Sequence, residues 1–110
     1  MVKEKDSRIR IERFGLKPDA VYLISEIFHR HPEVYRVKVF GSRAMGRFNG
    51  YSDVDLALWG KLNLNIIGRI MRELDELPLP YTFDVKAYER IKHSPLKRHI
   101  DEFGKILYSV

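Results

Sequence analysis

The run 53–59 constrains the fold more than any other part of the sequence, because acidic and apolar residues alternate along it. One set of alternating positions holds Val54, Leu56 and Leu58, and the other begins with Asp53 and Asp55. Side chains of a β-strand point alternately to its two faces, so the run predicts a strand with one buried face. Its other face carries two carboxylates on the same side, roughly 6–7 Å apart along the chain.

Two further runs show the same alternation and predict two more strands. In the run 34–40, Val37 and Val39 alternate with basic residues. In the run 81–87, aromatic and aliphatic residues alternate with polar ones, and Asp84 falls on the polar side. The sequence therefore predicts three strands, each with one apolar and one polar face.

Three segments have the apolar spacing of an amphipathic helix. They cover residues 17–31, 63–77 and, after Ser94-Pro95, a segment that ends near Tyr108. The predicted order is therefore α-β-β-α-β-α. It favours an α/β (α+β) fold in which a small mixed β-sheet carries the helices on one face and leaves the polar face partly open.

Length and composition limit the interpretation. A chain of 110 residues fits one compact domain, expected over 15–110, preceded by a charged N-terminal arm over 1–14. It has no cysteine, no long apolar run and no apolar N-terminal leader, so we expect a cytoplasmic location and no membrane contact. The net charge of +5 permits contacts with phosphate without identifying the molecule that carries it.

A turn rich in glycine connects the first two predicted strands. Gly41-Ser42 follows the first strand, and ten residues separate Ser42 from Asp53. Glycine lets a backbone approach a phosphate closely, and a serine hydroxyl and the following amides can donate hydrogen bonds to it. Arg43, with Lys38 and Arg47, supplies nearby positive charge.

The three aspartates can meet if their strands are neighbours, because facing side chains on adjacent strands lie about 5 Å apart. Carboxylates that close together repel each other unless a cation compensates their charge. Mg²⁺ favours carboxylates combined with substrate phosphates. Two such ions can clamp the entering and leaving oxygens of a phosphoryl displacement. Asp53, Asp55 and Asp84 are therefore the candidate metal-binding and catalytic residues.

Taken singly, these features have plainer explanations. An Asp-x-Asp pair is most often a solvated strand end, a Gly-Ser pair is a turn, and Arg43 alone is a surface charge. His99 falls on the apolar stripe of its helix and is interpreted as a histidine at the edge of the core. Trp59 fits either a core position or a surface that stacks on a base. The conjunction of the turn with three aligned aspartates is what favours catalysis.

The residues Gly41 to Gly46, followed after the fixed spacing by Ser52 to Leu58, resemble the minimal nucleotidyltransferases of the DNA polymerase β superfamily. These are the MNT-type antitoxins that pair with HEPN-domain toxins. The resemblance covers nearly the whole predicted domain. It implies a polymerase β-like fold, a nucleotidyltransferase activity that uses ATP and Mg²⁺, and a HEPN-domain partner.

The resemblance also implies roles for individual residues. Gly41 and Ser42 would bind the nucleotide phosphates, with Ser52 and Arg43 assisting the triphosphate. Met45 departs from the family, which often has arginine there.

The three aspartates have implied roles too. Asp53 and Asp55 would bind Mg²⁺, and Asp84 would share a metal and help to deprotonate the acceptor hydroxyl. The implied reaction transfers AMP from ATP to a hydroxyl of the partner, a tyrosine in toxin–antitoxin pairs.

Two other functions remain open at this point. The chain can be a non-catalytic subunit of the same fold that holds a nucleotide and its partner, although such a role does not require three adjacent negative charges. It can also be a basic nucleic-acid-binding module. Acidic groups on the open sheet face would repel a phosphate backbone, so direct nucleic-acid binding is not expected.

Overall fold

The computed structural model describes residues 13–50 and 52–110. The helices are α2 (Pro18–His29), α3 (Leu64–Asp75) and α4 (Ser94–Phe103), with a short 3-10 helix η1 (Tyr88–Arg90). The strands are β1 (Val34–Phe40), β2 (Val54–Gly60), β3 (Phe83–Ala87) and β4 (Lys105–Ser109). The expected charged arm falls almost entirely on residues 1–12, which lie outside the described part of the chain.

The strands form one mixed sheet in the order β3-β2-β1-β4. Strand β1 is antiparallel to both β2 and β4, whereas β2 and β3 are parallel. The expected class, a small mixed sheet with helices, is confirmed. The alternation read from the sequence also sets the pairing, because Val39 lies opposite Leu56 on the apolar face and Asp55 lies beside Asp84 on the other.

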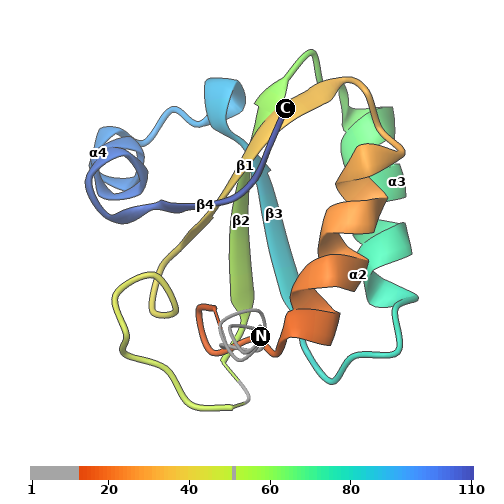
Figure 1. The fold of residues 1–110 in the computed structure, drawn as a ribbon. Helices are drawn as coiled ribbons and strands as arrows, with labels where there is room; N and C mark the ends of the chain where they lie inside the picture. Colours follow the sequence, from red (N-terminus) through yellow and green to blue (C-terminus); the bar gives the residue numbers. More distant parts are fainter. Residues whose placement is uncertain (1–12, 51) are drawn as a thin grey trace.

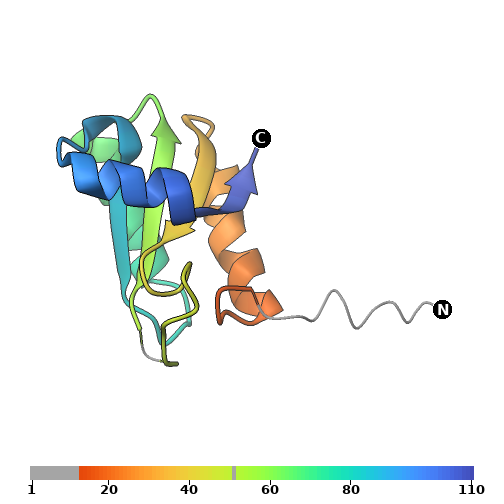
Figure 2. The ribbon, with the colours of Figure 1, turned by 90° about the vertical axis from the view of Figure 1, so that its left-hand side faces the viewer.

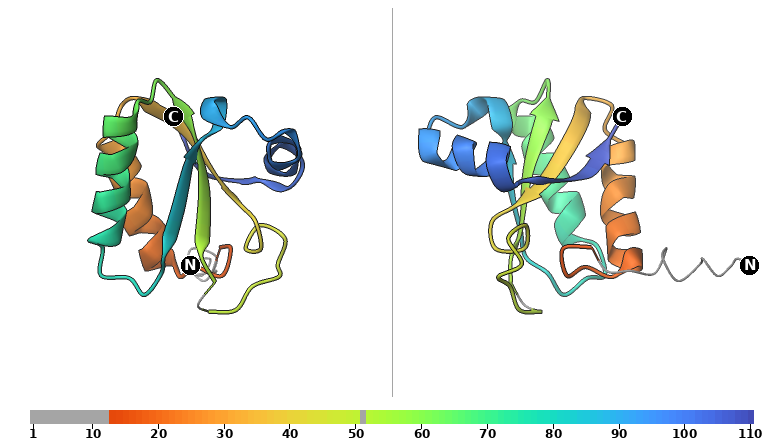
Figure 3. Two further views of the ribbon diagram at one scale, coloured as in Figure 1. Left: turned by 180° about the vertical axis from the view of Figure 1, so that it is seen from behind. Right: turned by 60° about the vertical axis from the view of Figure 1, so that its left-hand side comes forward.

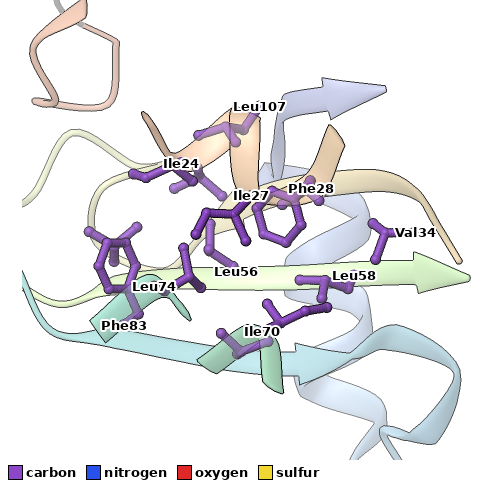
Figure 4. Packing of buried hydrophobic residues seen from close by; sticks show 14 of the residues in the cluster. Ile24, Ile27, Phe28, Val34, Leu56, Leu58, Ile70, Leu74, Phe83 and Leu107 are labelled. Atoms are coloured by element: carbon purple, nitrogen blue, oxygen red, sulfur yellow. The ribbon is translucent and has the colours of Figure 1, made fainter. Parts of the chain in front are cut away.

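Helices α2 and α3 lie side by side over one face of the sheet (Figure 1). Their apolar stripes meet the alternating side chains of the strands in the main core, where Ile24, Phe28, Leu56 and Ile70 are fully buried (Figure 4). Burial of one such side chain contributes roughly 1.5–3 kcal/mol. This core fixes which strand residues point away from α2 and α3.

Helix α4 lies on the opposite face of the sheet, to the left of the strands in Figure 1 and in front of them in Figure 2. This placement differs from the expectation that all helices share one face. The reason is a second apolar cluster, in which Ile100 of α4 packs on Phe40, Ala57 and Trp59. The sheet face that carries the aspartates is therefore polar only at the end where they lie. Farther along the strands it is apolar, and α4 covers it there.

The prediction that the last helix continues to Tyr108 is wrong. Helix α4 ends at Phe103, because Gly104 takes an extended conformation with φ −62° and ψ 142°. The five residues of β4 then pair with β1. The short apolar run that includes Leu107 fits a strand as well as a helix, and only its pairing with β1 decides between them.

The helix starts follow their sequence signals with one exception. Pro18 occupies the first turn of α2, and the Asn63 side chain caps α3 by accepting a hydrogen bond of 2.9 Å from the Ile66 amide. Ser94, a residue type that favours the N-cap, is instead the first residue of α4, and His93 takes the N-cap position. Pro95 then follows within the first turn, where its missing N–H costs nothing.

No helix in the described residues is long and apolar enough to cross a membrane. The cytoplasmic location expected from the sequence stays a prediction.

Candidate active site

The candidate site lies where the carboxyl end of β1 meets the first residues of β2 and β3, at the lower end of the sheet in Figure 1. Phe40 pairs with Asp55 across the antiparallel strands, and Asp55 pairs with Asp84 across the parallel ones. Asp53 precedes β2 and is exposed. The fold thus brings two of the candidate carboxylates onto neighbouring strands, with the third two residues away.

Asp55 lies at the electrostatic centre of this group. Its burial, followed by repulsion from Asp84 and Asp53, raises its pKa from 3.8 to about 6, while the positive charge of Lys86 acts in the opposite direction. Lys86 also lies near Asp84, with 3.8 Å between its Nζ and the Asp84 Oδ2. A carboxylate that is costly to ionise because of its like-charged neighbours favours a bound cation.

The carboxylates do not form a finished metal cage. No group of three or more His, Cys, Asp or Glu side chains in the described residues is assembled closely enough to hold a metal ion. Mg²⁺ usually keeps several water molecules and binds through one or two carboxylates together with substrate phosphates. The assignment of Asp53, Asp55 and Asp84 as ligands of Mg²⁺ therefore stays a prediction.

Gly41 makes the close approach of the turn to Asp55 feasible. Its φ of 73° lies in the left-handed region, and a Cβ built on it would overlap the Asp55 Oδ2. After Gly41 the chain coils tightly, because the Ser42 carbonyl accepts hydrogen bonds from the amides of Met45 and Arg47, at 3.2 and 2.9 Å. Only glycine satisfies both the conformation and the contact.

His99 of α4 also contacts this turn. Its Nε2 accepts a hydrogen bond of 2.9 Å from the Gly41 amide. The imidazole lies against the rings of Phe40 and Phe103, with centroid distances of 6.2 and 5.4 Å. This role could not be predicted from the sequence, because a histidine on an apolar helical stripe gives no signal of a partner 58 residues away.

Arg43 is buried within the loop that follows β1, with only 2% of its surface exposed. Its Nε and Nη2 donate to the Ser52 carbonyl, and its Nη1 donates to the Phe14 carbonyl at 2.9 Å. The guanidinium also lies over the rings of Phe48 and Tyr81. The expectation that Arg43 assists the triphosphate is therefore corrected: it ties the loop together.

The two serines of the predicted site differ in their surroundings. The Oγ of Ser52 accepts a hydrogen bond of 3.0 Å from the Asn49 amide, so this side chain takes part in the loop's own structure. Ser42 is half-buried beside Gly41 at the start of the turn. The expected role of Ser42 at a phosphate stays a prediction.

Trp59 belongs to the core. Only 8% of its surface is exposed, and its ring stacks on Tyr88 with a centroid distance of 4.5 Å. Stacking on a nucleotide base is therefore not its role in this conformation.

Comparison with known proteins decides the class of the chain. Residues 23–110 match the sequence model of the family described as "Polymerase beta, Nucleotidyltransferase". The chain belongs to this nucleotidyltransferase family. No protein with a curated description matches it closely enough to count as a relative.

Solved structures share the fold of this nucleotidyltransferase. A toxin–antitoxin structure with AMP-PNP matches with a TM-score of 0.68 and 19% identity, covering 82% of this chain and 73% of the other. The complex of a tri-AMPylated HEPN toxin with an MNT antitoxin from Shewanella oneidensis matches with a TM-score of 0.62 and 17% identity, covering 83% and 71%.

A third match is a structure described as a nucleotidyltransferase from Sulfolobus solfataricus. Its TM-score is 0.52 at 20% identity, and the match covers 96% of this chain and 89% of the other. Identities this low show the common fold.

Proposed function

We propose that this nucleotidyltransferase transfers AMP from ATP to a hydroxyl of a partner protein and depends on Mg²⁺. We further propose that the partner is a HEPN-domain toxin and that this chain is its antitoxin. The observation that carries the proposal is the register of β2 and β3, which sets Asp55 beside Asp84, next to the Gly41 turn. The fold shared with antitoxin complexes supports the choice of partner.

The three aspartates would hold the metal. Asp53, Asp55 and Asp84 supply the oxygen ligands, and the raised pKa of Asp55 reflects its burial and, after that, the negative charge of Asp84 and Asp53. Bound Mg²⁺ would neutralise this charge and polarise the reacting phosphate. The carboxylates thereby position both the nucleotide and the acceptor, and positioning is most of what catalysis of phosphoryl transfer requires.

The reaction balances with the residues present. The acceptor oxygen forms a bond to the α-phosphorus of ATP, the bond to the β-phosphate oxygen breaks, and pyrophosphate leaves. The proton of the acceptor hydroxyl passes to the Asp84 carboxylate, whose side chain is 48% exposed and so open to an incoming group. The Lys86 Nζ lies 3.8 Å from the Asp84 Oδ2, at the side of this carboxylate.

The turn after β1 would bind the triphosphate. Ser42 offers its hydroxyl, and it directly follows Gly41, whose backbone lies against Asp55. Arg47 is exposed near the same turn and can neutralise phosphate charge. Arg43 has no part in this proposal, because its donors are committed to backbone carbonyls.

The test uses ATP labelled in turn on the α- and γ-phosphate, with Mg²⁺ and the HEPN-domain protein that copurifies from the source cell. We expect the α-label to join the partner, the γ-label to leave as pyrophosphate, and transfer to be lost in Asp55→Asn. Asp75→Asn, an exposed carboxylate at the end of α3, is the matched control and should leave transfer unchanged. Equal transfer by both variants would refute the catalytic role.

Two observations favour the second candidate function, a non-catalytic subunit that holds a nucleotide and its partner. The Gly41 amide already donates to His99, and in the described residues the carboxylates stop short of a complete metal cage. This function predicts stable copurification with the partner and no label transfer, and the same complex should form with Asp55→Asn. The labelling experiment therefore separates the two functions.

A further inference from the structure

A pocket of about 340 Å³ lies along the last residues of β3, between the start of α3 and the start of α4. We call it the β3 groove. Its apolar lining comes from three elements, with Ile67 of α3, Val85 of β3 and Leu96 of α4 among its residues. Val85 is almost completely buried, whereas Leu64 at the rim is 69% exposed. The volume suits one or two apolar side chains rather than a helix.

The charge around the β3 groove has one sign. Lys86, Arg90, Lys92 and His93 line it, and none of its lining residues is acidic. The neighbouring Glu89 lines a different pocket. Three cations and a histidine around an apolar floor complement a ligand that is both apolar and acidic.

The groove also runs along an edge of the sheet. Strand β3 is outermost in the order β3-β2-β1-β4, and no strand in the described residues pairs with its outer side (Figure 3). Unpaired edges of this kind accept an extended peptide as an additional strand, with apolar pockets selecting its alternate side chains. An edge beside an apolar, basic pocket therefore favours a polypeptide over a small anion.

The position of the groove relative to the carboxylates points to the acceptor. Lys86 lines the groove and lies 3.8 Å from the Asp84 carboxylate, so the two sites are contiguous. The Gly41 turn lies on the other side of Asp55, at the end of β1. The entering and leaving oxygens of the transfer lie roughly in line. If the triphosphate is held at the Gly41 turn, the acceptor therefore approaches from the side of β3.

We propose that the β3 groove docks the acceptor segment of the partner protein, an extended stretch in which an apolar or aromatic residue is flanked by Asp or Glu. This inference rests on the proposed function, because the partner has an acceptor segment only if this chain is a transferase. The docking itself requires only the groove, its edge strand and its charge. It assigns Arg90, Lys92 and Leu64 to partner recognition.

The first test maps binding without catalysis. The probe is the peptide Asp-Glu-Leu-Tyr-Asp-Glu with blocked ends, titrated into the ¹⁵N-labelled protein without ATP. We expect amide shifts at Val85, Lys86, Ala87 and Ile91, with a Kd on the order of 1 mM or tighter. The same peptide with lysine at its acidic positions should bind at least about tenfold more weakly. Shifts confined to the Gly41 turn, or equal binding of both peptides, would overturn the inference.

The second test uses variants of the groove. Arg90→Glu combined with Lys92→Glu should weaken peptide binding about tenfold or more, and Leu64→Ser should weaken it several-fold through lost apolar contact. Lys17→Glu combined with Lys61→Glu changes the net charge equally at exposed sites outside the groove and should bind like wild type. An equal loss in this control would mean that total charge, not the groove, attracts the peptide.

The two proposals fail in different ways. If the groove variants bind the peptide and transfer label to the partner as well as wild type does, the docking inference is wrong and the proposed transferase activity stands. If Asp55→Asn still transfers label while the groove variants lose binding, the catalytic assignment is wrong and the docking site stands. Titration with ATP alone should shift the Gly41 turn; saturable shifts confined to the groove would identify it as a nucleotide site and overturn the inference.

Discussion

The Nε2 of His99 accepts a hydrogen bond of 2.9 Å from the backbone N–H of Gly41, which joins α4 to the turn beside Asp55. Because the amide is the donor, this ring nitrogen carries no proton, and the imidazole proton lies on Nδ1 when the ring is neutral. Helix α4 therefore contributes directly to the shape of the proposed phosphate-binding turn.

Replacement of His99 tests this link. His99→Phe keeps an aromatic ring between Phe40 and Phe103 but leaves the Gly41 amide without its acceptor. One lost hydrogen bond of about 0.5–1.5 kcal/mol corresponds to a roughly 2–12-fold weaker binding of ATP, measured by calorimetry. His99→Gln supplies an acceptor again and should recover part of the affinity. An affinity equal to wild type in His99→Phe would show that the contact does not shape the turn.

Gly41→Ala should abolish label transfer. The added Cβ would overlap the Asp55 Oδ2, in a backbone conformation that alanine disfavours. Displacing one carboxylate by about 1 Å can reduce the rate about 100-fold. Gly46→Ala is the matched control, because Gly46 has a similar φ of 72° with no atom within 4 Å of the added Cβ. Both variants should lose about 1 kcal/mol or more of stability, so only the loss of transfer should distinguish them.

Arg43 should matter for stability rather than for nucleotide binding. Arg43→Lys cannot reproduce the forked contacts to the Ser52 and Phe14 carbonyls, and we expect it to lower the free energy of unfolding by about 3 kcal/mol. Arg47→Lys, at an exposed position in the same loop, should leave stability within about 0.5 kcal/mol of wild type. Urea unfolding measures both. Normal stability with weakened ATP binding in Arg43→Lys would restore its predicted role at the triphosphate.

Asp55→Asn should stabilise the metal-free protein. The folded state raises the pKa of Asp55 to about 6, so it binds this proton more tightly than the unfolded chain, and stability falls as pH rises from about 3.8 to about 6. At pH 8 the neutral amide removes this cost, and Tm should rise by roughly 4–8 °C, the shift for about 1 kcal/mol in a small domain. Mg²⁺ should then raise the Tm of wild type more than that of the variant.

The pair His31–Glu73 predicts a loss of stability in acid. The hydrogen bond of 2.9 Å from His31 Nε2 holds the pKa of Glu73 below its ordinary value of 4.5. Its contribution is therefore complete above pH 4.5 and declines as pH falls through the lowered value. Glu73→Gln should cost about 1 kcal/mol at pH 7 and almost nothing at pH 3, measured by urea unfolding. Glu76→Gln, exposed at the end of α3, should show no such trend.

Period-two alternation predicted the three strands it covered and, with them, the relation between Asp55 and Asp84. Alternation is a local property, so it survives folding wherever one face is buried. It could not predict β4, because the run around Leu107 follows a helix and fits either period. The partner strand β1 lies more than 60 residues earlier in the chain, and only that pairing identifies the strand.

The placement of the candidate residues could be predicted where spacing within the chain determines it, and was missed where a distant element completes it. Gly41 directly follows β1, Asp53 directly precedes β2, Asp55 lies at the start of β2, and Asp84 lies in β3, so patterns within short segments are enough to place them. His99 and the burial of Arg43 depend on how α4 and the loop close over the end of the sheet. Ala57 and Trp59 occupy positions classed with the polar face, and their apolar character is what draws α4 there.

The parallel pairing of β2 with β3 makes correct folding a precondition for chemistry. A slip of one residue between these strands would turn Asp84 toward α3 and expel Phe83 and Val85 from the interior, since neighbouring strand positions face opposite ways. An inactive, misaligned conformer is therefore also an unstable one. Burial of the apolar side chains therefore selects the register that also aligns the aspartates. Molecules that stay folded in the cell are those with Asp84 correctly placed beside Asp55.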